Sequence, residues 1–196
     1  MILMQRTQQE VATRGNLQQT SHAISDAAAF DQFVGRQIVY FISENMKDTL
    51  VADILRNEGI SNGIIYMKTN FAADRLAEYL NRSGITAESV HDNKSRRTGD
   101  KSFANFRDSF TRILVTTESA ASKMTATGVA VIINYDLSVS AETYTRRLKQ
   151  HRMVAGRSIK AMSFCNESEK SSLKNINRVL MNELEVVEHH LDQSRP

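Results

Sequence analysis

The 196-residue sequence contains one cysteine and one proline. The single cysteine, Cys165, excludes an internal disulfide and a four-cysteine zinc site, and it favours a reducing compartment. We therefore expect a cytoplasmic or nuclear protein in which Cys165 fills the core as a small apolar residue rather than facing a cleft. The single proline, Pro196, excludes collagen-like and proline-rich linker architectures.

Long apolar runs are also missing. No stretch approaches the roughly 20 residues that are needed to cross a bilayer. The apolar start of the chain, MILM, is too short for a signal peptide. The sequence therefore predicts no secreted form and no membrane partner.

The chain lacks three motifs that mark common catalytic or cofactor sites. Neither Gly-x-x-x-x-Gly-Lys-Ser/Thr nor Gly-x-Gly-x-x-Gly occurs, so the chain alone has no backbone cradle for ATP or a dinucleotide, and we expect no cofactor. The Gly-x-Ser-x-Gly turn of many hydrolases is missing too. His189 and His190 are adjacent and would point about 100° apart on a helix, so they make poor co-ligands for a metal ion. We therefore predict no metal site.

The composition is that of an ordinary globular chain with a slight excess of positive charge. A hydrophobic content of 41% is enough for one good core, so two small domains are the less favoured arrangement. The net charge of +3 permits an anionic partner without requiring one.

The chain divides into a polar tail and one domain. Residues 1–36 are rich in glutamine and lack apolar periodicity, so we interpret them as a tail or adaptor segment, and residues 37–196 carry the domain. Segments of helical spacing alternate with short apolar runs, and Gly59 and Gly84 stand where two helices end. The runs are typical of strands covered on both faces and occupy residues 38–42, 63–67, 113–115, 129–133 and 161–164. This alternation predicts an α/β fold with a doubly wound, mostly parallel sheet flanked by helices.

Two later helices are expected from their apolar spacing. The first follows a basic loop, and its apolar face consists of Phe103, Phe106 and Phe110. The second is a long last helix that starts near Glu167 and continues to the two histidines. Its predicted buried residues are Leu173, Ile176, Leu180 and Leu184.

The carboxyl ends of parallel strands meet at one edge of a sheet, and ligands bind there in open α/β folds. We therefore expect the functional site at the residues that end the predicted strands. These are Lys68, Thr69, His91, Thr116, Thr117 and residues 134–136. The fold class alone does not name the ligand.

Two clusters of basic residues are candidates for phosphate binding. Lys94, Arg96 and Arg97 form one of them in the loop after His91. The other holds six cations against Glu142 alone, and these are Arg146, Arg147, Lys149, Arg152, Arg157 and Lys160. Phosphate contacts supply sequence-independent affinity for RNA. The alternative interpretation of either cluster is a solvated basic surface.

Four segments, in order, resemble motifs in the second RecA-like domain of DEAD-box RNA helicases, most closely those of the translation-initiation-factor type. GIIYMKT (63–69) resembles motif IV, and HDN (91–93) stands at the family's His-Gly-Asp. FANFRDSFTRILVTTES (103–119) resembles motif V, and VIINYDLSVSAETYTRRL (131–148) resembles the segment that leads into motif VI. The resemblance implies a RecA-like fold. From the two basic clusters we predict weak, unspecific contact with RNA phosphates, and the residues we expect to contact RNA are Lys94, Arg96, Arg97, Thr117, Arg146 and Arg147.

The departures from the family fall on residues that bind the nucleotide. The acidic residue that ends motif V is Thr125 here. The two motif VI arginines that reach the terminal phosphate fall on Gln150 and Met153 when counted from Arg147 without a gap. Arg152 is one residue away from the second position, which is a turn of about 100° on a helix. Loss of a transition-state arginine costs on the order of 10³ to 10⁵ in rate. The resemblance therefore implies a degenerate nucleotide site and no ATP binding by this chain alone.

Three functions remain open. The first is a catalytically inactive helicase-like domain that binds RNA, a protein, or both. The second is one half of a working RNA-dependent ATPase whose first RecA-like domain is absent from these 196 residues, with Arg152 in the arginine role. The third is a pure protein adaptor or self-associating scaffold. We favour the first, because basic groups persist where the nucleotide-binding groups are lost.

Overall fold

The structure is a computed structural model that describes residues 34–123, 128–137, 140–151, 159–180 and 184–188. Most of the expected tail lies outside these residues. The strands are β1 (Val34–Phe41), β2 (Gly63–Met67), β3 (Ala87–Val90), β4 (Ile113–Thr117), β5 (Val131–Asn134), β6 (Ile159–Cys165) and β7 (Glu185–Glu188). The helices are η1 (Glu44–Met46), α2 (Lys47–Asn57), α3 (Asn70–Arg82), α4 (Arg96–Arg107), α5 (Glu118–Ala121), α6 (Ala141–Gln150), η2 (Glu167–Glu169) and α7 (Lys170–Leu180).

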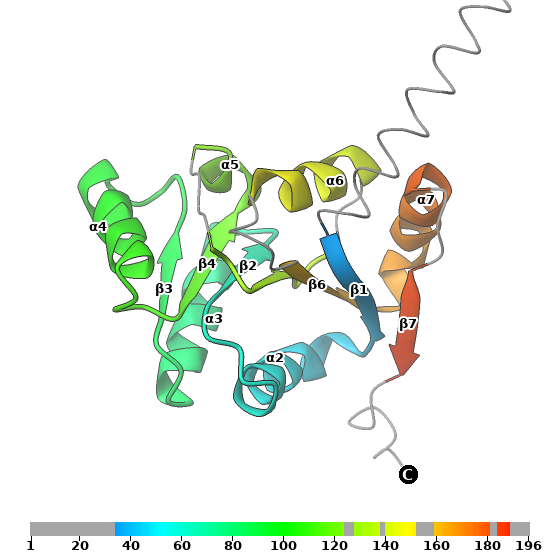
Figure 1. Cartoon of the computed structure of the whole chain (residues 1–196), viewed down its shortest axis with the longest axis horizontal. Coiled ribbons are helices and arrows are strands. Elements are labelled where there is room, and N and C mark those ends of the chain that lie inside the picture. Colours follow the sequence, from blue (N-terminus) through cyan, green and yellow to red (C-terminus); the bar gives the residue numbers. More distant parts are fainter. Residues whose placement is uncertain (1–33, 124–127, 138–139, 152–158, 181–183, 189–196) are drawn as a thin grey trace, which may run out of the picture.

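The seven described strands form one sheet in the order β3-β4-β2-β5-β6-β1-β7. Every pair of neighbours is parallel. Parallel neighbours require crossover connections, which the intervening helices provide (Figure 1). The predicted doubly wound, mostly parallel sheet is therefore confirmed.

Helices cover both faces of the sheet (Figure 1). On one face α2 and α3 bury Leu50 and Leu76, and on the other α4, α5, α6 and α7 contribute residues such as Phe106 and Tyr144 to a second core. Cys165 is fully buried in this second core, as the sequence predicts, and burial raises the pKa of its thiol to about 11. The sheet is packed against a hydrophobic core on each face, so the strand ends at its carboxyl edge are held in place.

Two glycines end the helices of the first face, as predicted. Gly59 follows α2 with a φ of 60°, and Gly84 follows α3 with a φ of 78°. Positive φ is strained for residues that carry a Cβ. These two positions therefore fix where the chain turns back toward β2 and β3.

The predicted helix around Phe103 is wrong at both ends. α4 starts earlier than expected, so Arg96 and Arg97 lie in its first turn rather than in a loop. It stops at Arg107, and Ser109 then adopts a φ of 64°. Phe110 is consequently outside the helix and 77% exposed instead of sharing its buried face.

The predicted last helix is too long. α7 ends at Leu180, and Leu184 precedes β7. β7 is an edge strand that the sequence does not predict. Ile176 is fully buried as expected. His189 and His190 lie outside the described residues. None of the described helices is both long and apolar enough to cross a membrane.

The crossovers open a crevice at the carboxyl edge. β2 is followed by α3 on one face of the sheet, whereas its neighbours β4 and β5 are followed by α5 and α6 on the other face. The connections that leave these strands therefore diverge. Ligand sites of open parallel sheets lie at such points.

Candidate nucleic-acid interface

Two hollows open at the carboxyl edge and share Asp92 in their linings. The first, which we call the α4 pocket, has a volume of about 640 Å³ and lies between the end of β3, the start of α4 and α5. The second, which we call the central pocket, has a volume of about 600 Å³ and lies at the ends of β2, β4 and β5. The predicted location of the site at strand ends agrees with both hollows.

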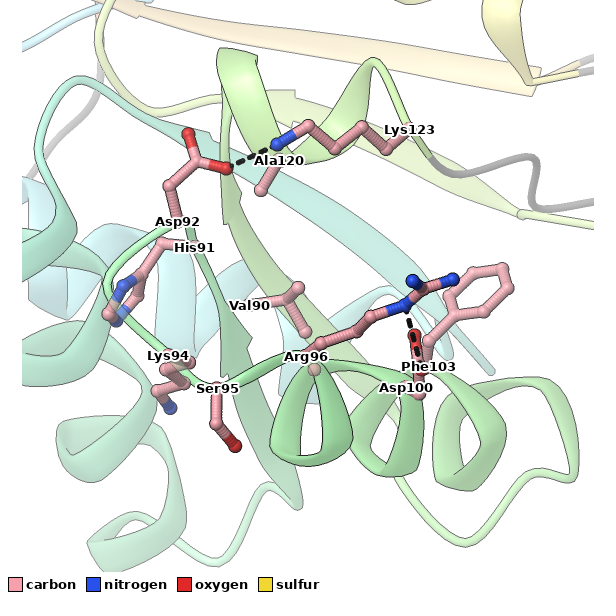
Figure 2. A pocket seen from close by; sticks show the side chains of 11 residues that line it. Val90, His91, Asp92, Lys94, Ser95, Arg96, Asp100, Phe103, Ala120 and Lys123 are labelled. Atoms are coloured by element: carbon pink, nitrogen blue, oxygen red, sulfur yellow. Dashed lines mark hydrogen bonds and ion pairs between the residues drawn. The ribbon is translucent and has the colours of Figure 1, made fainter.

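The amino end of α4 brings basic side chains to the α4 pocket (Figure 2). Ser95 caps the helix by accepting a hydrogen bond from the Thr98 backbone amide. Arg96 and Arg97 follow in the first turn and are exposed. The Arg96 side chain is 95% exposed and lies 3.8 Å from Asp100, a pairing that contributes little in water. The partial positive charge of the helix end adds to that of the two arginines.

Lys94 lies at the rim of the same pocket and is held by α3. Its ammonium group donates to the Ser89 hydroxyl at 2.6 Å and lies 3.1 Å from the Asp74 carboxylate. Ser89 and His91 lie 2.5 and 2.9 Å from the same carboxylate. Burial raises the pKa of Asp74, but hydrogen bonds from Ser89, His91 and Lys94 outweigh it and hold the pKa at about 2. The ionised carboxylate fixes Lys94 in position and offsets part of its charge.

The far side of the α4 pocket is closed by an ion pair between Asp92 and Lys123, 2.8 Å apart (Figure 2). The hydrogen bond from Lys123 lowers the pKa of Asp92. Three cations, Lys94, Arg96 and Lys123, line the pocket against the carboxylates of Asp92 and Asp100. The α4 pocket is therefore mildly basic.

The central pocket has the opposite character. Four carboxylates line it, against the cations of Lys68 and Arg147. Burial raises the pKa of one of these carboxylates, that of Asp136, even though it accepts a hydrogen bond from the Lys68 backbone amide. Thr117 is buried, and its hydroxyl finds no hydrogen-bond partner among the described residues. The described part of the chain holds no group of three metal-ligating side chains.

Arg147 is an internal group of the central pocket. Its guanidinium contacts the Glu118 carboxylate at 2.5 Å, donates to the Asn134 side-chain oxygen at 2.9 Å and lies 4.5 Å from the centre of the Tyr66 ring. Only 7% of its side chain is exposed. Arg146 pairs with the same Glu118 at 2.8 Å, but half of its side chain faces solvent. The two arginines therefore share one carboxylate, and only Arg146 remains accessible.

Gln150 is the residue on which the first of the two expected phosphate-reaching arginines falls in the ungapped count from Arg147. Gln150 ends α6 and donates to the Ala121 backbone carbonyl. The Gln150 side chain is neutral, and it binds the protein backbone. Thr125, Arg152 and Met153, the other degenerate positions, lie outside the described residues.

The predicted RNA-binding residues do not gather in one place. Lys94 and Arg96 line the α4 pocket, and Arg97 is exposed beside Arg96 in the first turn of α4 without lining the pocket, whereas Thr117 and Arg147 line the central pocket. The sequence also does not predict the carboxylates that pair with Lys94 and Arg147. Asp74 is 20 residues before Lys94, and Glu118 is 29 before Arg147. No local pattern signals such pairs, although Glu118 does end the Thr-Thr-Glu run at the end of β4.

Residues 46–158, more than half of the chain, match the family described as the helicase conserved C-terminal domain. The chain belongs to this family. The matching relatives and solved structures place it with the DEAD-box helicases, so it is a DEAD-box helicase C-terminal domain. The resemblance drawn from motifs IV to VI is confirmed.

Relatives of this helicase C-terminal domain include initiation and splicing factors. A probable eukaryotic initiation factor 4A of Trypanosoma cruzi is 30% identical over 140 residues, which are 70% of this chain and 34% of the relative. The pre-mRNA-splicing ATP-dependent RNA helicase PRP28 of Pyricularia oryzae is 26% identical over 75% of this chain and 22% of the relative. The chain thus spans about a third or less of the length of these relatives.

Solved structures of the same fold include the E. coli DEAD-box protein SrmB bound to regulator of ribonuclease activity A. It has a TM-score of 0.74 and 19% identity, and the match covers 83% of this chain and 94% of that one. S. cerevisiae Dbp5 bound to RNA and ADP BeF3 has a TM-score of 0.71 and 21% identity over 82% of this chain and 43% of that one. At these identities the likeness establishes the RecA-like fold.

Proposed function

We propose that this helicase C-terminal domain is a catalytically inactive module that binds single-stranded RNA through its phosphates. The observation that carries the proposal is the contrast between the two pockets. The α4 pocket offers exposed cations at Arg96 and Lys123, and the part-buried Lys94 adds a third cation that Asp74 partly offsets. In the central pocket Arg147 is neutralised by Glu118, and Gln150 stands where the family has an arginine.

The loss of catalysis follows from charge. A neutral amide stabilises the negative charge that develops on a transferring phosphoryl group far less than a guanidinium does, because it carries no positive charge. An arginine in that role contributes 10³ to 10⁵ in rate in the enzymes that use one. Gln150 supplies no such charge. RNA binding requires only cations near the backbone phosphates, which the α4 pocket retains.

The relatives support RNA as the partner to test first. PRP28 is named an ATP-dependent RNA helicase, and Dbp5 has been solved with RNA. SrmB, by contrast, has been solved with a protein. A protein partner for this chain is therefore the competing outcome of the RNA test.

Salt dependence of RNA binding is the decisive measurement. Each phosphate contact contributes about −0.7 to the log–log salt slope on single strands, so three to five contacts give a slope of roughly −2 to −3.5. Reversing Arg96 and Arg97 to Glu should lower the affinity for poly-U and poly-A alike and flatten the slope by about one unit. Lys174→Glu with Arg178→Glu changes the net charge equally on exposed positions of α7 and serves as the control.

The outcomes separate the candidates. Equal losses in both double variants would mean that RNA responds only to net charge, which contradicts a site at the α4 pocket. Absence of RNA binding at 50 mM salt, or a slope near zero, would reject RNA as the partner. The protein adaptor or self-associating scaffold would then be the favoured function.

A further inference from the structure

Phe71 is the most exposed large apolar side chain of the described residues, with 79% of its surface accessible to solvent. An isolated exposed apolar residue needs no functional explanation. Phe110 illustrates this, since it is 77% exposed in the turn before β4. What distinguishes Phe71 is its place in the fold.

Phe71 lies in the first turn of α3, directly after the carboxyl end of β2. Side chains of a helix lean toward its amino end. Phe71 therefore lies at the carboxyl edge of the sheet, which is the edge that carries both pockets. Phe110, in the connection that enters β4, lies at the opposite, amino edge.

The helix that carries Phe71 also contacts the basic groups of the α4 pocket, through Asp74. Phe71 and Asp74 are three residues apart on α3 and so share one face of the helix. Asp74 contacts Lys94 at 3.1 Å, and Lys94 precedes Arg96 at the start of α4. β3 packs against both α3 and α4, so the amino ends of these two helices flank the end of one strand (Figure 1).

From this arrangement we infer that Phe71 is a stacking platform for a base of single-stranded RNA. The inference rests on the function proposed above. The cations at Lys94, Arg96 and Arg97 hold phosphates of the strand, and the flat apolar face of the ring covers an adjacent unpaired base. Such stacking tolerates every base because each has a π-face. Stacking adds to the affinity that the cations supply through their contacts with RNA phosphates.

The sequence offers a direct probe, because the chain contains no tryptophan. A Phe71→Trp variant of the full 196-residue chain carries a single indole at the proposed platform. Its fluorescence should be quenched by oligo-U and oligo-A, whereas an abasic oligonucleotide should bind without quenching it. Phe110→Trp carries an equally exposed indole at the other edge and should not respond to any of the three.

Affinity gives the second measurement. Phe71→Ala should weaken oligo-U binding by at least about fivefold, the lower end of what loss of one stacked base costs. The salt slope should stay that of the wild type, because no phosphate contact is lost. Phe71→Leu retains an apolar side chain without an aromatic face and should weaken binding as well. Phe110→Ala should leave the affinity unchanged.

The results distinguish this inference from the proposed function. If Phe71→Ala and Phe71→Leu bind oligo-U as tightly as the wild type while the Arg96→Glu, Arg97→Glu variant does not, phosphate binding stands and stacking is rejected. An unquenched indole at saturating RNA would reject stacking too. If the wild type binds no RNA at 50 mM salt, the proposed function fails, and the stacking platform fails with it.

Discussion

The guanidinium of Arg147 lies 4.5 Å from the ring centre of Tyr66 and 2.5 Å from the carboxylate of Glu118, so it is enclosed between an aromatic face and an anion. In the sequence Arg147 is one of six cations in a basic segment. In the fold it is a buried structural group that joins α6 to the ends of β4 and β5.

Removal of Arg147 should therefore destabilise the domain rather than only weaken RNA binding. Arg147→Ala removes the donor to the Asn134 side-chain oxygen and one of the two arginines that pair with Glu118. We expect a loss of about 2 kcal/mol in the free energy of unfolding. Urea unfolding measures it. Arg146→Ala is the control, because its exposed pair should contribute less than about 1 kcal/mol. Equal small losses in both variants would mean that Arg147 is not an internal group.

The glycines provide a test of the helix ends. Gly59→Ala and Gly84→Ala should each lose about 1 kcal/mol of stability. The cause is positive φ alone, because an added Cβ would meet nothing within 4 Å at either position.

Gly99 lies inside α4, where a Cβ would make an ordinary 3.7 Å contact with Val90. Gly99→Ala should therefore stabilise by about 0.5–1 kcal/mol. A neutral result at Gly59 and Gly84 in thermal unfolding would contradict the assigned conformations.

Ser109 is the converse case. It adopts a φ of 64° after α4 although it carries a Cβ, and its backbone amide bonds back to the Phe106 carbonyl. Glycine reaches this conformation without steric cost, so Ser109→Gly should stabilise the domain by about 0.5–1 kcal/mol. Denaturant midpoints of the two proteins measure the change. A loss of stability would show that the serine side chain makes a compensating contact.

The chain alone should show no ATP turnover. It lacks a phosphate-cradling loop, and Gln150, where the ungapped count from Arg147 predicts an arginine, is uncharged. Phosphate release with and without RNA should stay at background, and Gln150→Arg with Met153→Arg should not raise it. Turnover above background would contradict the inactive assignment. Turnover that appears only when a first RecA-like domain of a relative is added would favour the alternative of a half-helicase.

Stability should depend on pH through Asp74. Its pKa is about 2 in the folded domain against an ordinary value of 3.8, so folding favours the ionised form. This contribution is complete above the unfolded value and is lost as the pH falls from 3.8 toward 2. Because half of the side chain is exposed, we expect at most about 1 kcal/mol. The difference in urea stability between wild type and Asp74→Asn should therefore shrink below pH 4. A difference that does not change with pH would exclude this role for the charge.

The sequence predicts what depends on local pattern. β2 spans Gly63–Met67, the bounds of the apolar run, because a strand buried on both faces needs no polar alternation. The phenylalanine spacing continued past the true end of α4 because a residue in positive φ, Ser109, ends the helix without a glycine to signal it. β7 was missed because Glu185 and Glu188 enclose only two valines at an exposed edge.

The site was predictable in location but not in its electrostatics. Strand ends can be placed from apolar runs, so the carboxyl edge was correctly identified as the place of the pockets. Whether a cation there is free depends on partners from other elements. Lys94 and Arg147 are paired with carboxylates on α3 and α5, and such tertiary pairs leave no periodic trace. Arg96 differs, because its partner Asp100 lies on the same helix at 3.8 Å and its side chain is 95% exposed.

The position of β1 in the sheet has a consequence for the newly made chain. The first described strand lies between β6 and β7, the last two of the described strands in chain order. Its backbone amides and carbonyls therefore have no neighbouring strand while the intervening segment of over a hundred residues is being synthesised. Such distant pairing also makes closure of the sheet slow relative to helix formation. The domain can complete its sheet only after translation has passed β7, and until then the apolar run of β1 is exposed to chaperones and to other nascent chains.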